Sequence, residues 1–233
     1  TQQILQQAQK AQAGADLEAA TKEVEDYRGI EKQLNDALTA KDDQNQVTYR
    51  ITSDGLVVGL VADNVFFANA SADVEPKGLE VLSVIGPILA ALPNGIAVQG
   101  HTNSLPLSSS VRYRDNWDLS SNRANTVLNF FRVNNGVSPQ RLSSTGYADS
   151  RPLYPDSDAR ALAGNRRVDL TVASPSTDAV KALLPQVAAG LPTTNGPAEV
   201  ETGEPTTLEA SAPSVTNAVV TGIVPDLAGN VTH

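Results

Sequence analysis

Two short stretches, Gly100-His101-Thr102-Asn103 and Asn116-Trp117-Asp118-Leu119-Ser120-Ser121-Asn122-Arg123-Ala124, decide the fold of this 233-residue chain. The first follows an apolar run at residues 96–99 that is typical of a short buried strand, and the second opens an amphipathic helix. The carboxyl ends of strands and the first turns of helices meet at one edge of an α/β layer, where ligands usually bind. We therefore expect the polar residues of both stretches to lie together.

The second stretch has the chemistry of an anion site. The first turn of a helix presents free N–H groups and a partial positive charge, and Arg123 adds a bidentate guanidinium one or two turns further on. Both features favour a carboxylate, while Thr102 and Asn103 offer hydrogen bonds to a second polar group. An equally weighted alternative is that Arg123 only forms a surface ion pair with Asp115 or Asp118.

The surrounding sequence predicts helices that alternate with strands. Ser53-Asp54-Gly55 is a hairpin turn, and a helix with one apolar side begins at Pro76 and stops at Pro93-Asn94-Gly95. The helix that contains Arg123 ends at Asn134-Asn135-Gly136. The predicted strands are residues 47–52, 56–61, 96–99, 142–147 and 168–172. This order predicts an α/β fold, with a sheet covered by helices on one face, over residues 46–173.

Residues 1–45 form a polar, helical lead-in with a heptad-like apolar stripe that Glu31 interrupts. Two interpretations stay open, a solvated linker helix and, slightly favoured, a short parallel coiled coil that holds a homodimer; Gly14 and Gly29 weaken either helix. The stripe consists of Leu17, Ala20, Val24, Tyr27, Leu34 and Leu38.

Residues 174–233 have a different composition, with recurring prolines, no aromatic residues and many Thr, Ala and Gly. Such a segment buries too little apolar surface to offset the entropy of ordering it. We predict a disordered acidic tail, with at most a turn or two of transient helix at residues 179–187.

Composition excludes several classes of function. The net charge of −9 argues against nucleic acid or an anionic bilayer surface as the partner. The chain has no cysteine, so disulfides, cysteine metal sites and cysteine nucleophiles are excluded, and we expect no cofactor. It also has no methionine, so we expect a signal peptide or membrane anchor to precede Thr1, and no apolar run here is long enough to span a bilayer.

Four ordered motifs carry a family resemblance. They are residues 67–76 (Phe-Ala-Asn-Ala-Ser-Ala-Asp-Val-Glu-Pro), Gly100-His101-Thr102, the Asn116–Ala124 stretch and Asn165-Arg166-Arg167-Val168. Together they resemble the OmpA-like peptidoglycan-binding domain, whose fold is an α+β sandwich with a mixed sheet. The Asn-Trp-acidic-Leu-Ser form of the third motif, with Pro106 in a lengthened loop, is most similar to the MotB family of flagellar motor stator subunits.

The resemblance implies non-catalytic binding of the diaminopimelate-type stem peptide of peptidoglycan. In the family, an Asp after Gly-His-Thr pairs with the side-chain ammonium of diaminopimelate, and the Arg of Leu-Ser-x-x-Arg binds its carboxylate. Arg123 matches the Arg, but Asn103 stands where the family has Asp. Three explanations stay open: weaker affinity, a chemically altered stem peptide such as an amidated one, and a substitute carboxylate such as Asp115.

Other residues carry weaker hypotheses. Leu119 and Ser120 are expected in the groove, although Leu119 is equally typical of core, and Asn165 and Arg166 either reach the ligand or brace their loop. His101 is expected to form hydrogen bonds within the fold rather than to titrate or bind a metal. The expected peptidoglycan-binding residues are Thr102, Asn103, Leu119, Ser120, Arg123 and Arg166.

Three functions follow from these observations. The first is a wall-anchored stator subunit in the cell envelope, on the outer side of the inner membrane, with a MotA-like membrane partner bound through a preceding segment. The second is another OmpA-like anchoring protein, a lipoprotein or an outer-membrane protein. The third, a wall hydrolase that uses Ser120 or a pair of acids, has little support because the sequence has no nucleophile elbow and no zinc set, and His101 has no evident nucleophile partner.

Overall fold

Five strands form one mixed sheet in the computed structural model, which describes residues 2–41, 43, 46–61, 66–107 and 112–190. The strand order is β1-β2-β5-β3-β4; the β3–β4 pair is parallel and the other pairs are antiparallel. The strands are β1 (Val47–Thr52), β2 (Gly55–Val61), β3 (Ile96–His101), β4 (Leu142–Gly146) and β5 (Arg167–Ala173). The predicted mixed sheet is confirmed, strand for strand.

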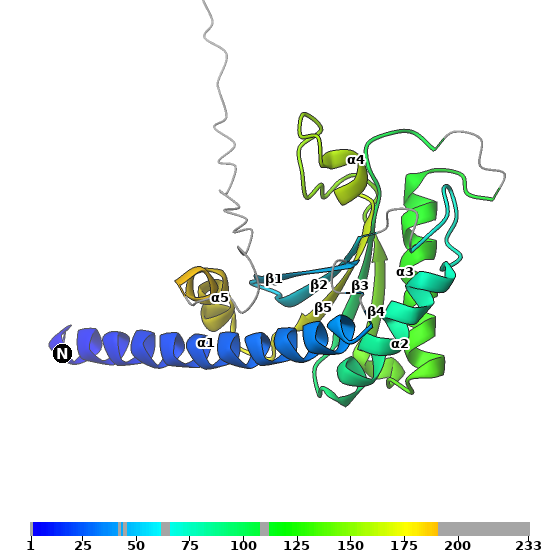
Figure 1. Cartoon of the computed structure of the whole chain (residues 1–233). Helices are drawn as coiled ribbons and strands as arrows, with labels where there is room; N and C mark the ends of the chain where they lie inside the picture. Colours follow the sequence, from blue (N-terminus) through cyan, green and yellow to red (C-terminus); the bar gives the residue numbers. More distant parts are fainter. Residues whose placement is uncertain (1, 42, 44–45, 62–65, 108–111, 191–233) are drawn as a thin grey trace, which may run out of the picture. The chain divides into compact units, whose positions relative to one another are not determined.

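Side chains alternate between the two faces of this sheet, as the pleat requires. On β5, Val168, Leu170 and Val172 are fully buried in the apolar core, whereas Arg167 and Asp169 belong to the opposite face. Helices α2 (Pro76–Ala91) and α3 (Asn116–Asn134) lie side by side against the apolar face (Figure 1). Two short elements complete the region, η2 (Pro139–Arg141) and α4 (Ala161–Gly164). The prediction of helices on one face is confirmed.

Helix α1 (Gln2–Thr39) uses its apolar stripe within its own chain. Ala20, Val24, Tyr27, Leu34 and Leu38 are buried in the core, where the helix contacts α2, α5 and β1. The coiled-coil interpretation of this stripe is therefore wrong from Ala20 onwards, because a side chain packed in the domain core cannot also face a second helix. A seven-residue apolar repeat predicts that one face of a helix is buried, but it does not predict whether a second chain or the same chain covers that face.

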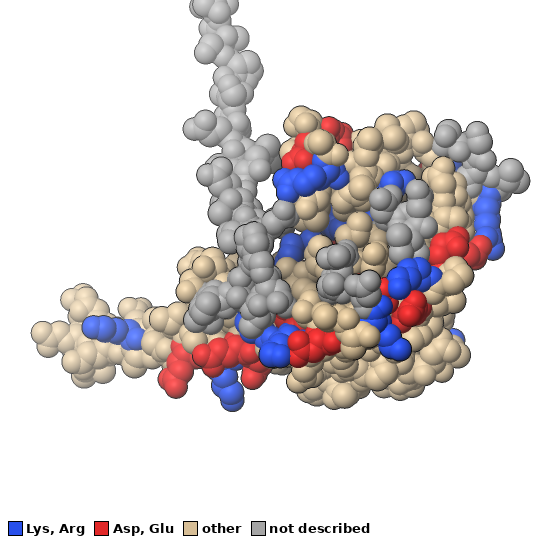
Figure 2. Space-filling view, in the orientation of Figure 1, with Lys and Arg blue, Asp and Glu red and all other residues tan. Residues whose placement is uncertain are grey.

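Two other residues on this side of α1, Leu17 and Glu31, show where the packing begins and how it continues. Leu17, the first residue of the predicted stripe, is 51% exposed, so the packed part of α1 begins after it. Glu31 does not interrupt the packing, because its buried carboxylate pairs with Arg28 at 2.7 Å. Charged side chains line the solvent side of the helix (Figure 2), among them the Lys32–Asp36 pair at 2.6 Å.

Helix α5 (Asp178–Gly190) corrects the predicted tail boundary. Val180, Leu184 and Ala188 are spaced four apart, and all three are buried in the core beside α1. Each helix alone carries a narrow apolar stripe, and the two stripes cover each other. The rest of the predicted disordered tail, residues 191–233, lies outside the described residues. None of the described helices is long and apolar enough to cross a membrane.

Candidate ligand-binding pocket

A pocket of about 290 Å³ lies where the first turns of α3 meet the carboxyl end of β3. Four segments meet there: the loop that precedes α2, the loop that follows β3, one face of α3, and the residue that precedes β5. The lining residues are Asn69, Ala70, Thr102, Asn103, Leu105, Pro106, Leu107, Asn116, Leu119, Arg123 and Arg166. Five of the six predicted site residues are in this set, which is where the two sequence stretches were expected to meet.

Arg123 is a buried cation held by backbone carbonyl groups. Only 4% of the residue is exposed; its Nε donates to Ser71 O at 2.8 Å and an Nη to Ala68 O at 3.4 Å. Its guanidinium also lies 5.0 Å from the centre of the Phe67 ring. Burial, and then the like charge of Arg166, lowers the pKa of Arg123 to about 10, so the side chain remains charged at neutral pH.

The alternative role of Arg123, a surface ion pair, is wrong. Asp115 caps α3 by accepting a hydrogen bond from Asp118 N at 2.8 Å, and the Asp118 carboxylate lies 3.7 Å from Arg114 Nε. Among the described residues, Arg123 therefore has carbonyl and aromatic neighbours and no carboxylate. A buried guanidinium without a counter-ion favours binding of an anion from outside the chain.

Two glycines allow the second turn of α3 to sit directly on the strand ends. A Cβ at Gly100 would lie 2.0 Å from Ser120 O, and a Cβ at Gly146 would lie 2.2 Å from Ser121 Oγ. Ser120 is fully buried at this contact, where its hydroxyl donates to Trp117 O and accepts from Ala148 N, each at 3.1 Å. Ser120 is therefore not a lining residue, which corrects its predicted place in the groove.

The loop after β3 is fixed by side-chain amides. Asn103 Nδ2 donates to Leu162 O and Asn103 Oδ1 accepts from Leu105 N, both at 3.3 Å. Asn116 Nδ2 donates to Leu105 O at 2.9 Å and joins this loop to the first turn of α3. Thr102 is anchored by its backbone N–H, which donates to Ala148 O at 2.8 Å, and its buried hydroxyl has no hydrogen-bond partner among the described residues.

The structure places Asn165 and Arg166 in different surroundings. Asn165 is 1% exposed and holds its loop, since its Oδ1 accepts from Leu153 N and Tyr154 N at 2.8 and 2.9 Å. Its Nδ2 donates to Tyr154 O at 2.8 Å. Arg166 instead reaches the pocket, so the brace and the lining residue are neighbours in the chain.

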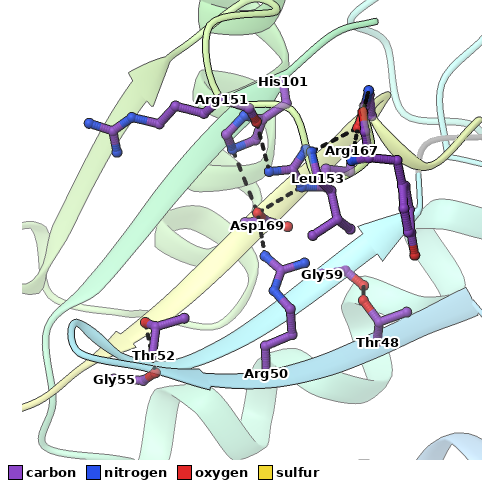
Figure 3. Close-up of polar contacts among 12 residues, drawn as sticks. Thr48, Arg50, Thr52, Gly55, Gly59, His101, Arg151, Leu153, Arg167 and Asp169 are labelled. Atoms are coloured by element: carbon purple, nitrogen blue, oxygen red, sulfur yellow. Dashed lines mark hydrogen bonds and ion pairs between the residues drawn. The ribbon is translucent and has the colours of Figure 1, made fainter. Parts of the chain in front are cut away.

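His101 belongs to a separate polar cluster on the face of the sheet opposite the core. Asp169 is its centre: one carboxylate oxygen lies 3.0 Å from Arg50, 2.9 Å from Arg167 and 3.6 Å from His101 Nε2 (Figure 3). The His101 ring stacks on Tyr147, and burial, followed by the charge of Arg167, lowers its pKa to about 4. His101 is thus neutral at pH 7, and among the described residues neither of its ring nitrogens has the hydrogen-bond partner that was expected. Within the described ranges, no three His, Asp or Glu side chains form a group that could hold a metal ion.

Sequence reasoning missed several lining residues. Asn69 and Ala70 lie in a stretch that was quoted as a motif but was not assigned to the site, although Ala70 has a left-handed backbone (φ 51°) that shapes this wall. Asn116 was also part of a quoted motif and was not assigned to the site. The apolar loop residues Leu105, Pro106 and Leu107 carry no chemical signal of their own, apart from the length of the loop.

Comparison with known families supports the resemblance. A family model described as the OmpA family matches residues 66–166, a range that contains all the described residues that line the pocket. The OmpA-like resemblance drawn from the four motifs is therefore confirmed.

Two curated relatives illustrate the range of similar proteins. The uncharacterized protein YtxE of Bacillus subtilis is 30% identical over 67% of this chain and 64% of its own length. Motility protein B of Escherichia coli K12 is 32% identical over 52% of this chain and 40% of its own length. The chain thus spans less than two thirds of the length of either relative.

Two solved structures have the same fold. A MotB-like protein from Desulfovibrio vulgaris superposes with a TM-score of 0.59 at 24% identity, over 65% of this chain and 96% of that one. The cell wall anchor of the T6SS from Pseudomonas aeruginosa superposes with a TM-score of 0.53 at 30% identity, over 60% of this chain and 96% of that one. The first comparison establishes the fold, and the second adds sequence similarity to a wall anchor.

Proposed function

The chain carries an OmpA family domain at residues 66–166, and on that premise we propose that it binds the peptide stem of peptidoglycan without catalysis and anchors a membrane complex to the cell wall. The finer proposal is a MotB-like stator subunit of the flagellar motor. That role includes a homodimer, a MotA-like membrane partner, and attachment to the inner membrane through a segment outside this chain.

The buried guanidinium of Arg123 is the observation that carries this proposal. It lines a pocket whose volume fits an amino-acid side chain, and within the described residues its neighbours are carbonyl oxygens and an aromatic ring. A carboxylate of the stem peptide would supply the missing counter-charge. Both of its oxygens can accept from the guanidinium, which gives a bidentate contact with geometric specificity.

The stator role has support from the relatives, and one alternative has support of its own. Similarity to Motility protein B at 32% identity favours a stator subunit. The 30% identity to the T6SS wall anchor favours the second candidate, an OmpA-like anchor of another envelope complex. The coding sequence upstream of Thr1 discriminates between them: a single apolar helix with an embedded Asp supports the stator, and a lipobox cysteine supports a lipoprotein.

Co-sedimentation with isolated peptidoglycan sacculi tests wall binding. We expect the wild-type chain to pellet with the sacculi and Arg123→Gln to remain in the supernatant, because glutamine keeps hydrogen-bonding capacity and loses the charge. Arg132→Gln is the matched control, since Arg132 is exposed on the same helix and, among the described residues, donates hydrogen bonds to Asn129.

A second measurement separates lost binding from lost folding. Soluble stem peptide should compete the wild-type chain off the sacculi, and circular dichroism should show that Arg123→Gln remains folded. A folded wild-type chain that stays in the supernatant would refute wall binding. Equal pelleting of folded Arg123→Gln and Arg132→Gln would refute the assignment of the pocket.

A further inference from the structure

The peptide group between Ser71 and Ala72 is held at both ends by side chains that are distant in the sequence. Its carbonyl oxygen accepts a hydrogen bond from Arg123 Nε at 2.8 Å, and its N–H donates to Tyr113 Oη at 3.2 Å. Ala72 and Tyr113 are both buried, so the second contact is shielded from water. Because a peptide unit is planar and its N–H and C=O point in opposite directions, this unit links Tyr113 to Arg123.

The segment that carries this peptide is irregular. A bridge between Phe67 and Val74 closes it, and inside the bridge Ser71 N donates to Ala68 O at 3.1 Å. Both contacts leave the Ser71 carbonyl and the Ala72 N–H to partners outside the segment. A planar peptide unit can reverse its direction by rotation about the two Cα atoms that flank it, which would turn the carbonyl away from the guanidinium.

Tyr113 is well placed to prevent this rotation. Its ring packs with Ala72 and Leu119 in a small apolar cluster that is separate from the main core, and Leu107 packs against the same cluster. Leu107 and Leu119 both line the pocket. The ring therefore holds the Tyr113 hydroxyl between the irregular segment and the first turn of α3.

The two hydrogen bonds of the peptide reinforce each other. Donation from the charged guanidinium polarises the peptide and makes its N–H a stronger donor to the tyrosine oxygen. Without that oxygen the Ala72 N–H would be buried without this acceptor, and rotation of the peptide would relieve the cost. We propose that Tyr113 is a positioning residue: its hydroxyl orients the Ser71–Ala72 peptide so that the carbonyl holds Arg123 ready for a ligand carboxylate.

This inference rests on the proposed function, and Tyr113→Phe tests it, because the substitution keeps the ring and removes only the oxygen. Co-sedimentation of the full chain over a range of sacculus concentrations would give the apparent affinity. We expect Tyr113→Phe to bind about three- to tenfold more weakly than wild type, because binding must then also order the arginine side chain.

Two control variants separate this role from other effects. Tyr49→Phe also removes a buried hydroxyl, one that has no hydrogen-bond partner among the described residues and belongs to a ring on β1. Arg112→Gln removes the exposed ion pair with Asp73, which joins the same two segments as Tyr113 does. Both controls should keep the wild-type affinity. An equal loss in Arg112→Gln would assign the effect to general contact between the segments and overturn the role of the hydroxyl.

Hydrogen exchange followed by NMR gives a second measurement that needs no ligand. In wild type the Arg123 Nε–H and the Ala72 N–H should both be protected, and the first signal is assigned by its absence in Arg123→Gln. In Tyr113→Phe the Arg123 Nε–H should exchange about tenfold faster, in line with the loss of one hydrogen bond. The amides of β5 should exchange as in wild type, which distinguishes release of the arginine from general destabilisation.

The outcomes keep the two proposals apart. If wild type pellets with the sacculi and folded Tyr113→Phe binds equally well, the inference is overturned and the proposed function stands. An unprotected Arg123 Nε–H in wild type also overturns the inference, whether or not the variant folds, and so does an unchanged exchange rate in Tyr113→Phe. If folded wild type stays in the supernatant, wall binding is refuted, and the exchange rates alone decide whether Tyr113 holds Arg123.

Discussion

Replacement of Leu34 by alanine tests whether the apolar stripe of α1 belongs to the core of its own chain. Leu34 is fully buried, whereas Leu17, almost five turns earlier on the same helix, is 51% exposed. The two positions therefore allow the same substitution in the same helix with opposite environments. Leu34→Ala should destabilise the fold, and Leu17→Ala is the control.

The size of the effect follows from burial. The substitution removes three buried carbon atoms, and at about 0.8 kcal/mol for each the lost transfer free energy is about 2.4 kcal/mol. The cavity that remains adds a further cost, so we expect the free energy of unfolding to fall by about 3 kcal/mol. For a domain of this size the Tm should fall by about 6–12 °C. Leu17→Ala should change the stability by less than about 0.5 kcal/mol.

Urea and thermal unfolding, followed by circular dichroism at two or more protein concentrations, would measure these effects. Packing within one chain predicts that Leu34→Ala lowers the midpoint by the same amount at every concentration, so that the variant keeps the concentration dependence of wild type. A coiled-coil seam at this stripe predicts that Leu34→Ala weakens association and therefore changes the concentration dependence. Such a change, or a cost for Leu34→Ala no larger than for Leu17→Ala, would refute the burial of this stripe within its own chain.

Two further predictions concern the strand ends. Gly100→Ala should lower stability by about 1–3 kcal/mol and weaken sacculus binding, because the added Cβ would meet the Ser120 carbonyl. Gly14→Ala should be neutral or stabilising, because the space around Gly14 is open. Equal denaturation midpoints for the two variants would contradict this prediction. The depressed pKa of His101 means that the unfolded chain binds more protons between pH 6.5 and about 4, so stability should fall by on the order of 3 kcal/mol as the pH decreases through that window. His101→Gln should show a shallower pH dependence in urea titrations, and an unchanged slope would place the His101 pKa near its ordinary value.

The sheet and the helices that cover its apolar face could be predicted because their signals are local. The alternation of Val168, Leu170 and Val172 with polar residues specifies a half-buried strand wherever its neighbours lie. Proline at the start of α2 and the Asn-Asn-Gly sequence after α3 specify helix ends in the same way. Since short-range patterns decide these elements, one sequence was enough.

The packing of α1 against α5 could not be predicted, because it depends on two segments that are far apart in the sequence. The apolar stripes of α1 and α5 each predict a buried face without indicating which segment covers it. Pro185, which favoured disorder in the sequence analysis, lies within α5. The contact between them brings Arg28 Nη2 within 3.4 Å of Ala188 O, residues separated by most of the domain. A compositional argument judges each segment alone, so it underestimates apolar surface that only becomes buried when two segments meet.

The contacts of Arg123 in the pocket could not be predicted from the sequence either, because they involve single backbone atoms of a distant loop. Arg123 and Asn103 could be identified from the sequence because their side chains carry the chemistry. Arg123 is held by the backbone carbonyl oxygens of Ala68 and Ser71. Every residue has a backbone carbonyl, so no residue type in the sequence identifies these two. Whether an arginine is an exposed partner of an acid or a buried cation that awaits an anion depends on where those carbonyls lie, and only the folded loop places them. The functional consequence follows from this placement: because the backbone already holds the guanidinium in position, a ligand carboxylate can gain its full charge–charge contact without first having to order the arginine side chain.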